Sequence, residues 1–328
     1  MRHTCLARHA FPAAVAGLLL LTLTACGTER PGAAATGSAE PPACGPGASP
    51  AESAGVPRTG MPGASASPAQ DGDASASPAQ DGVTIIGTGG GASAGAPSCA
   101  VYSVTSRETE PFTYVVTVGF VSETGQALFN VDDTVQAVAP GRTVRRTVTA
   151  TGHSPDAVGK ARARVVKVRS FPTSEAPSVG GTCPPTGVRV YADEGDAAMG
   201  LRVVGLHLEN CGTMPYRLNG YPRVEIRDED HDRVDGVSIV QGGDAVAGGT
   251  GADGPPQQLV LEPGERAHAG LVWRNTVEAG DPVHAPYARV WAKPGAAPVT
   301  VTPELDLGTT GKLGVGPWKK AGEQAGTR

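Results

Sequence analysis

Apolar and polar residues alternate along most of the chain after position 99, which is the period-two pattern of half-buried β-strands. The alternation is clearest from Phe112 to Phe120, where every second residue is Phe, Tyr or Val. Similar short stretches follow, bounded by turns rich in Gly and Pro, and no amphipathic helix is evident. They predict further strands at 127–138, 143–150, 161–171, 187–191, 201–208, 223–227, 234–241, 258–261, 267–273 and 287–292.

Short strands at even spacing, separated by turns, are typical of β-sandwiches. We therefore predict an all-β chain with two immunoglobulin-like β-sandwich domains, at 99–182 and 183–318, and a polar tail at 319–328. Each domain has a Pro-Gly pair just before a strand, Pro140-Gly141 in the first and Pro263-Gly264 in the second. Both pairs predict β-turns, which suggests that the two sandwiches are of similar design.

The stretch before the first sandwich has a different composition. Residues 27–98 contain no aromatic residue, consist mostly of Gly, Ala, Ser and Pro, and include a near-repeat at 64–72 and 74–82. Such a segment buries too little apolar area to offset its ordering entropy. We expect residues 26–98 to form a disordered linker, about 45 Å in root-mean-square span. Cys44 and the strand-like residues 83–86 fit a linker poorly, and either could belong to the first sandwich.

The N-terminus has the features of an export signal. Arg2 and Arg8 precede a mostly apolar stretch at 11–25, which is shorter than the roughly 20 residues of a bilayer span. The run Leu23-Thr24-Ala25-Cys26-Gly27 resembles the bacterial lipobox, in which a peptidase cleaves before the cysteine and its thiol takes a diacylglycerol. We expect residues 1–25 to be removed and lipid on Cys26 to anchor the protein at the extracytoplasmic face of the cell membrane. The alternative is an ordinary secretory signal with an incidental cysteine.

Charge argues against one class of partner. The formal net charge is −5, and removal of residues 1–25 deletes two arginines and takes it to −7. A net acidic chain is a poor nucleic-acid binder. The basic stretch at 160–169 alternates, which favours a solvated strand face over an anion-binding patch.

Four cysteines remain in the expected mature chain after Cys26, and in an exported protein they predict disulfides. We favour Cys183–Cys211 together with Cys44–Cys99. The alternative is Cys99–Cys183, with the other two free. The sequence contains no C-x-x-C pair and no clustered histidines, so neither a zinc site nor a cofactor is predicted.

An acidic run offers a weak metal hypothesis. Asp228, Asp230 and Asp232 have the spacing of a calcium loop, but Arg233 and Ile239 stand where such a loop needs Gly and Glu. We therefore expect a solvated turn. Motifs of known hydrolases and nucleotide-binding enzymes, such as G-x-S-x-G, H-E-x-x-H and the P-loop, are missing from the sequence, so no enzyme is predicted.

Aromatic residues offer a candidate binding surface. Trp273, Trp291, Tyr221 and Tyr287 would form a platform for a sugar or a peptide if exposed. Arg274 and Asn275, which follow Trp273, would be a polar strand end or an interaction edge. Aromatic side chains in sandwich strands are usually core residues, and we favour that interpretation.

Three runs resemble one known family: residues 210–222 (NCGTMPYRLNGYP), 261–265 (LEPGE) and 271–275 (LVWRN). They are similar to an actinobacterial extracytoplasmic domain called domain of unknown function 4232, and the resemblance extends over 183–318. It implies a β-sandwich and no established activity, and many members are predicted lipoproteins. The commoner family pattern has a cysteine near the position of Tyr216, whereas this chain has Cys211.

Together these features predict a lipid-anchored, non-catalytic binding or scaffold module of the cell envelope. Its partner would be a cell-wall polymer or another envelope protein, in addition to the membrane. The alternatives are a small-ligand or calcium-binding lipoprotein and a hydrolase with an unrecognised site.

Overall fold

The computed structural model describes residues 81–90, 98–150 and 161–322. In these ranges almost all regular structure is β-strand, which confirms the predicted all-β fold. The predicted signal segment, Cys26, Cys44 and most of the predicted linker lie outside the described residues. Within them, no helix has the length and apolar character needed to cross a membrane.

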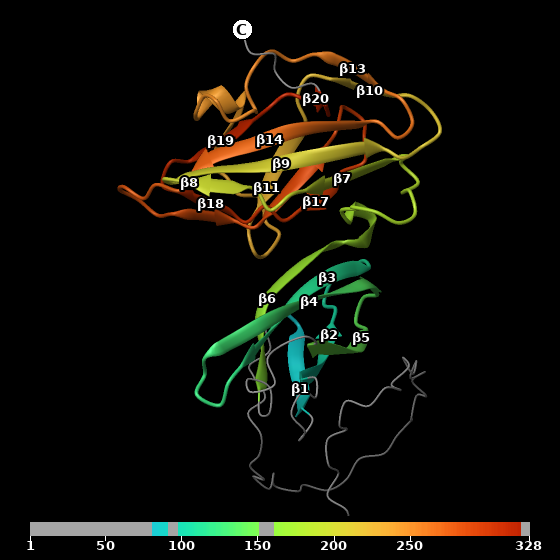
Figure 1. The fold of residues 1–328 in the computed structure, drawn as a ribbon, viewed down its shortest axis with the longest axis vertical. Coiled ribbons are helices and arrows are strands. Elements are labelled where there is room, and N and C mark those ends of the chain that lie inside the picture. The colour runs from blue at the N-terminus through green and yellow to red at the C-terminus, as the bar shows by residue number, and fades with distance from the viewer. Residues whose placement is uncertain (1–80, 91–97, 151–160, 323–328) are drawn as a thin grey trace, which may run out of the picture. The chain divides into compact units, whose positions relative to one another are not determined.

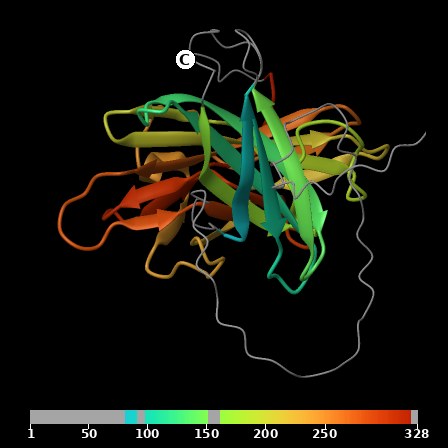
Figure 2. The same cartoon turned by 90° about the horizontal axis from the view of Figure 1, so that it is seen from below.

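The first sandwich consists of two three-stranded antiparallel sheets, which can be followed in Figures 1 and 2. One sheet has the strand order β1-β2-β5 and the other has the order β4-β3-β6. The strands are β1 (Val83–Gly90), β2 (Ser98–Thr105), β3 (Phe112–Val121), β4 (Ala127–Val138), β5 (Thr143–Ala150) and β6 (Arg162–Pro172). The 3-10 helix η2 (Thr173–Glu175) follows β6.

The alternation that predicted β3 also builds the core of this sandwich. Phe112, Val116 and Phe120 are at most 6% exposed and pack against Tyr102 of the facing sheet. The hydroxyl of Tyr102 donates a hydrogen bond to Asp133 of β4 at 2.7 Å. The two sheets are therefore joined by an apolar core and by a polar link at its edge.

Strand β1 corrects the predicted domain boundary. It pairs with β2 from Val83 to Gly90, so the first sandwich includes residues that composition had assigned to the linker 26–98. The reason is local alternation: Val83 and Ile85 enter the core, whereas Ile86 is 46% exposed. The strand-like residues 83–86 are thus the start of the folded part.

The second sandwich encloses its own core between a seven-stranded sheet and a three-stranded sheet. The large sheet has the order β12-β19-β14-β9-β7, with β20 beside β14 and β8 beside β9, and the small sheet has the order β11-β16-β17. The central strands β9 and β14 lie side by side in Figure 1. The strands of the large sheet are β7 (Val188–Ala192), β8 (Asp196–Ala198), β9 (Leu201–Asn210), β12 (Ser238–Gln241), β14 (Arg266–Arg274), β19 (Lys312–Val315) and β20 (Lys319–Lys320).

The remaining strands are shorter. The small sheet is made of β11 (Arg223–Arg227), β16 (Tyr287–Trp291) and β17 (Val299–Val301). Two two-stranded sheets pair β10 (Tyr216–Asn219) with β13 (Gln258–Leu261) and β15 (Val283–Ala285) with β18 (Leu305–Gly308). The 3-10 helix η3 (Gly243–Ala245) follows β12. Because β20 pairs with β14, the predicted tail 319–328 begins as part of the sheet.

The favoured disulfide Cys183–Cys211 is confirmed, with a Cα–Cα distance of 5.6 Å. It lies at one end of the antiparallel pair β7–β9. Cys99 is also disulfide-bonded, and its predicted partner, Cys44, lies outside the described residues.

Both predicted Pro-Gly turns are confirmed. The amide of Arg142 donates to the carbonyl of Ala139, and the amide of Glu265 donates to that of Glu262. Gly141 and Gly264 have φ values of 67° and 86°. These values lie in the left-handed region, which explains why glycine occupies the third position of each turn.

Candidate ligand-binding pockets

Trp273 is a core residue. It is 2% exposed, and its indole Nε1 donates a hydrogen bond to Asp306 Oδ1 at 2.7 Å. Asn275 donates to the other oxygen of Asp306 at 3.0 Å, and Arg274 is exposed at the end of β14. Trp273 therefore does not form an exposed platform. Its ring packs in the core, and its indole N–H is satisfied by the carboxylate of Asp306. The sequence reasoning did not identify Asp306 as its partner.

The acidic turn after β11 is held together by its first carboxylate. Asp228 Oδ1 accepts hydrogen bonds from the backbone amides of Asp230 at 3.0 Å and Asp232 at 2.9 Å. In the part of the chain that the structure describes, no group of three or more His, Cys, Asp or Glu side chains gathers as a metal site. The geometry is that of a side-chain-stabilised turn.

His231, in the same turn, was not predicted to be a contact residue. Its Nε2 lies 3.1 Å from Ser170 Oγ, and its ring lies 4.5 Å from that of Tyr287, measured between centroids. Burial lowers the pKa of His231, and nearby Arg227 adds to the effect, while acidic neighbours oppose it. Ser170 lies within strand β6 and is 8% exposed. Ser170 of the first sandwich and His231 of the second are thus in direct contact, and the ring of Tyr287 packs beside them.

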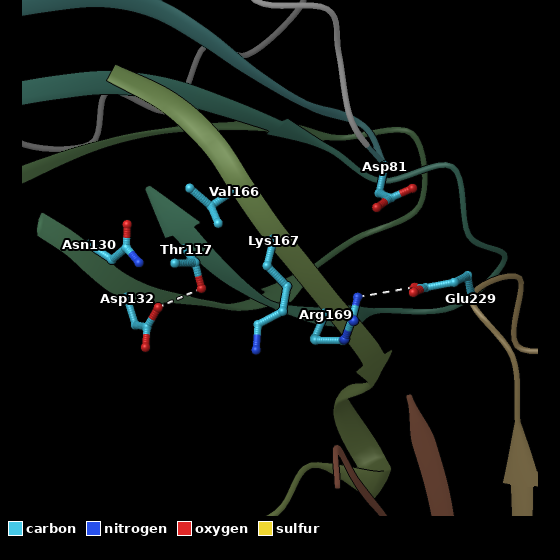
Figure 3. Close-up of a pocket in the computed structure, with 8 residues that line it drawn as sticks. All are labelled: Asp81, Thr117, Asn130, Asp132, Val166, Lys167, Arg169 and Glu229. Atoms are coloured by element: carbon cyan, nitrogen blue, oxygen red, sulfur yellow. Dashed lines mark hydrogen bonds and ion pairs between the residues drawn. The ribbon is translucent and has the colours of Figure 1, made fainter. Parts of the chain in front are cut away.

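A large polar pocket lies beside this contact (Figure 3), with a volume of about 780 Å³. Its polar groups largely satisfy one another: Thr117 donates to Asp132 at 2.6 Å, and Arg169 donates to Glu229 at 3.0 Å. In Figure 3 the two residues of each pair point toward one another. The lining residues are Asp81, Thr117, Asn130, Asp132, Val166, Lys167, Arg169 and Glu229.

The cations of this polar pocket are already neutralised. Arg169 also donates to both oxygens of Glu304, at 2.8 and 2.6 Å, and Lys167 donates to the same carboxylate at 3.3 Å. Burial raises the pKa of Glu304, but the hydrogen bond and charge of Arg169, with Lys167, outweigh burial and bring the pKa below its ordinary value. Glu304 therefore stays ionised at neutral pH, and little positive charge is left for a ligand.

A second pocket, which we call the edge pocket, has a volume of about 460 Å³ and lies within the second sandwich. It forms where strands from the ends of the two sheets come together, β12 at one end of the large sheet and β11 at one end of the small sheet. The lining residues are Tyr221, Pro222, Arg223, Val224, Ile239, Val240, Gln241, Trp291, Lys293, Pro294, Gly295 and Val315. Tyr221, a predicted binding residue, is thus part of a pocket wall, half-buried.

The edge pocket has two cations and no acid in its lining. Arg223 and Trp291 are cross-strand partners, and the guanidinium carbon of Arg223 lies 3.9 Å from the centroid of the indole ring. Lys293 Nζ lies 3.7 Å from the ring centroid of Tyr216 and donates to the carbonyl of Arg217 at 3.2 Å. Among the described residues, no ion pair joins either cation to a carboxylate.

The rest of the lining is largely apolar. Val224 and Val315 form a buried part of the wall, and Ile239 on edge strand β12 is 41% exposed. Exposed aliphatic side chains beside unpaired cations make a surface that suits a ligand with both an apolar and an anionic part. Sequence reasoning identified Tyr221 and Trp291 as candidate binding residues but missed the pocket and its two cations, because the lining comes from four separate segments of the chain.

No curated protein matches the chain. Residues 183–319 match the family described as domain of unknown function (DUF4232), so the second sandwich, which holds the edge pocket, is similar to the members of that family.

Proposed function

We propose that this protein is a non-catalytic binding protein of the cell envelope, which holds a small ligand in the edge pocket and is anchored by lipid on Cys26. The observation that carries the proposal is the pair of cations, Arg223 and Lys293, which lie beside an apolar wall without a carboxylate partner. A volume of about 460 Å³ is within the usual range of small-molecule pockets.

The extracytoplasmic location is supported by the chemistry of the chain. The sequence Leu23-Thr24-Ala25-Cys26 matches the lipobox pattern, and the composition of the segment that follows is that of a linker. The disulfide Cys183–Cys211 and the disulfide-bonded Cys99 favour an oxidising compartment. Anchor, linker and sandwiches together would present the pocket outside the membrane.

Binding rather than catalysis is supported by the arrangement of the reactive side chains. Ser170 and His231 are within hydrogen-bond reach of each other, but Ser170 is 8% exposed within a strand. No hydrogen bond from His231 to a carboxylate is recorded within the described ranges. A nucleophile–base pair needs such an orienting group and an accessible nucleophile. An ester-hydrolysis assay that detects activity, lost in Ser170→Ala, would favour the hydrolase alternative.

The binding proposal is tested by identifying what the protein carries. The full chain is expressed with its signal segment, purified from membranes and denatured, and the released small molecules are identified by mass spectrometry. The same is done with Ile239→Trp, which fills the pocket, and with Val277→Trp, a 63% exposed position that does not line the pocket. We expect a molecule that the wild type and Val277→Trp carry and Ile239→Trp lacks. Identical contents in all three proteins would contradict the proposal.

The anchor is tested separately by cell fractionation. Cys26→Ala removes the thiol that would carry the lipid, and Cys5→Ala removes a cysteine from the predicted signal segment. We expect Cys26→Ala to lose the lipid and to leave the pool of mature membrane-bound protein, whereas Cys5→Ala stays in it. Wild-type protein without a lipid on Cys26, as shown by mass spectrometry, would rule the anchor out.

A further inference from the structure

We propose that the ligand of the edge pocket is an amphipathic anion, a molecule with an aliphatic or aromatic body and a single carboxylate or phosphate head group. This inference rests on the proposed binding function and specifies the ligand class.

The first cation is held in place without being neutralised. The guanidinium of Arg223 lies against the face of Trp291 at 3.9 Å, a contact that fixes its position and leaves its charge intact. No hydrogen bond from this guanidinium to a protein acceptor is recorded within the described ranges. A stacked guanidinium of this kind can present a fork of N–H donors, which matches a carboxylate or phosphate.

The second cation of the lining, Lys293, also favours an anionic head group. Lys293 Nζ is placed by the face of Tyr216 and by the carbonyl of Arg217, neither of which carries a formal negative charge. Its ammonium has three donors, and one carbonyl occupies one of them. Two ordered positive charges in the lining of one pocket favour an anion over a neutral or cationic ligand.

Arg223 is exposed, and it differs from the more buried arginines in having no acidic partner. The chain is acidic, with a formal charge of −5, and the buried and half-buried arginines of the described residues pair with acids. These pairs are Arg169–Glu304, Arg189–Glu209, Arg202–Asp306, Arg227–Glu225 and Arg289–Glu175. Acidic partners are thus abundant, yet the edge pocket has none in its lining. An anionic ligand would supply the acidic partner that the lining of the edge pocket lacks.

The apolar wall of the edge pocket favours a ligand that also has an apolar part. Ile239 is 41% exposed on strand β12, and Val224 and Val315 provide buried aliphatic surface in the same lining. Covering exposed aliphatic surface contributes about 25 cal/mol per Å² to binding. A small inorganic anion would leave this surface in water, whereas an amphipathic anion would cover it.

The ligand class is tested with matched probes on residues 27–328, which contain both sandwiches. Decanoate, decyl phosphate and the uncharged decanol are titrated below their aggregation concentrations, with calorimetry and tryptophan fluorescence as readouts. Trp273 and Trp318 are at most 2% exposed, so the fluorescence response comes from Trp291. We expect at least one of the two anions to bind at least tenfold more tightly than decanol.

Two variants connect the preference to the pocket. Arg223→Leu removes the stacked cation and should reduce anion affinity about tenfold while leaving decanol unchanged. Arg145→Leu removes an exposed arginine of the first sandwich that does not line the pocket and should change neither affinity. Circular dichroism and melting temperature verify that both variants are folded.

The outcomes separate this inference from the proposed function. Equal binding of decanol and the anions, or anion binding that Arg223→Leu does not weaken, overturns the ligand class. If no probe binds although purified protein carries a pocket-dependent molecule, the ligand class is wrong and the binding function stands. If that molecule is missing as well, both fail. Comparison of decanoate with decyl phosphate distinguishes the two head groups.

Discussion

The guanidinium of Arg169 in strand β6 donates hydrogen bonds to both carboxylate oxygens of Glu304, at 2.8 and 2.6 Å. Arg169 belongs to the first sandwich and Glu304 to the second, and the side chain of Arg169 is only 9% exposed. Glu304 has a φ of 53°, a conformation that few residues other than glycine adopt. The pair is therefore a bidentate contact between a buried guanidinium and a partly exposed carboxylate, which is held on an uncommon backbone conformation.

Glu304→Gln should destabilise the protein, because it leaves the buried guanidinium with Glu229 as its remaining carboxylate partner. We expect a loss of about 2 kcal/mol in the free energy of unfolding, less than for a fully buried pair because Glu304 is partly exposed. Denaturant unfolding followed by circular dichroism measures it. Glu229→Gln is the matched control: its side chain is 52% exposed, and it should cost less than about 1 kcal/mol. Equal losses in the free energy of unfolding for the two variants would show that burial of the carboxylate does not decide how strongly it pairs with Arg169.

Reduction of the Cys183–Cys211 disulfide should destabilise the second sandwich. The bond closes a loop with a sequence separation of 28, for which chain entropy gives about 3–4 kcal/mol. The double variant Cys183→Ser/Cys211→Ser, compared with wild type by denaturant unfolding, isolates this bond from that of Cys99. An unchanged midpoint in the variant would mean that β7 and β9 are held by their ladder and core alone.

Two tryptophans should respond differently to the same substitution. Trp273→Phe loses the hydrogen bond to Asp306 within the core, and we expect a loss of about 1–3 kcal/mol in stability. Trp291→Phe keeps a ring beneath Arg223 and should change stability by less than about 1 kcal/mol, while reducing ligand binding. Thermal unfolding of both variants checks the contrast. A larger stability loss for Trp291→Phe would make Trp291 a structural residue.

Stability should fall as the pH drops below about 6.5, the ordinary pKa of histidine. Burial lowers the pKa of His231, so the unfolded chain takes up a proton at a higher pH than the folded protein does. The contribution of His231 is therefore complete above the unfolded pKa and is lost as the pH falls toward the folded one. The pKa of His268 is also lowered by burial and contributes in the same direction.

His231→Asn should flatten this pH dependence in part. Asparagine suits the φ of 64° at this position, so the turn is retained while the titrating ring is removed. Melting temperatures measured from pH 7.5 to 5.5 should decline less steeply in the variant than in wild type. His284→Asn, at an exposed position, serves as the control. A variant whose slope equals that of wild type would place the pH dependence elsewhere.

The core of each sandwich could be predicted from sequence because it depends on local alternation. Strands such as β3, β4, β5, β11 and β13 appear where the pattern predicts them. The predicted strand 234–241 is shorter in the structure and begins at Ser238. Gly236 interrupts it, with a φ of 84°. Short strands such as β15, β17 and β18 were missed, since three or four residues carry little periodicity, whereas β13, of similar length, is marked by the Pro263-Gly264 turn that follows it.

The edge pocket could not be predicted from sequence, for a different reason. Arg223 and Trp291 are neighbours only because β11 and β16 pair in one register, and the pairing of distant strands is not visible in a local pattern. Trp273 attracted attention because it stands beside Arg274 and Asn275, yet the burial of β14 makes it a core residue. Tyr221 and Trp291 were identified by their aromatic character, and both line the pocket.

The most direct test of the central claim, that the edge pocket is the binding site, uses the indole N–H signals of ¹⁵N-labelled protein. The buried indoles of Trp273 and Trp318 donate to Asp306 and to the carbonyl of Ala292, whereas Trp291 lines the pocket. A small-molecule extract of the source cell envelope is added, and the three signals are assigned by Trp→Phe variants. We predict that the Trp291 signal shifts in a saturable manner while the other two stay in place. An unmoved Trp291 signal, with or without shifts elsewhere in the protein, would contradict the account.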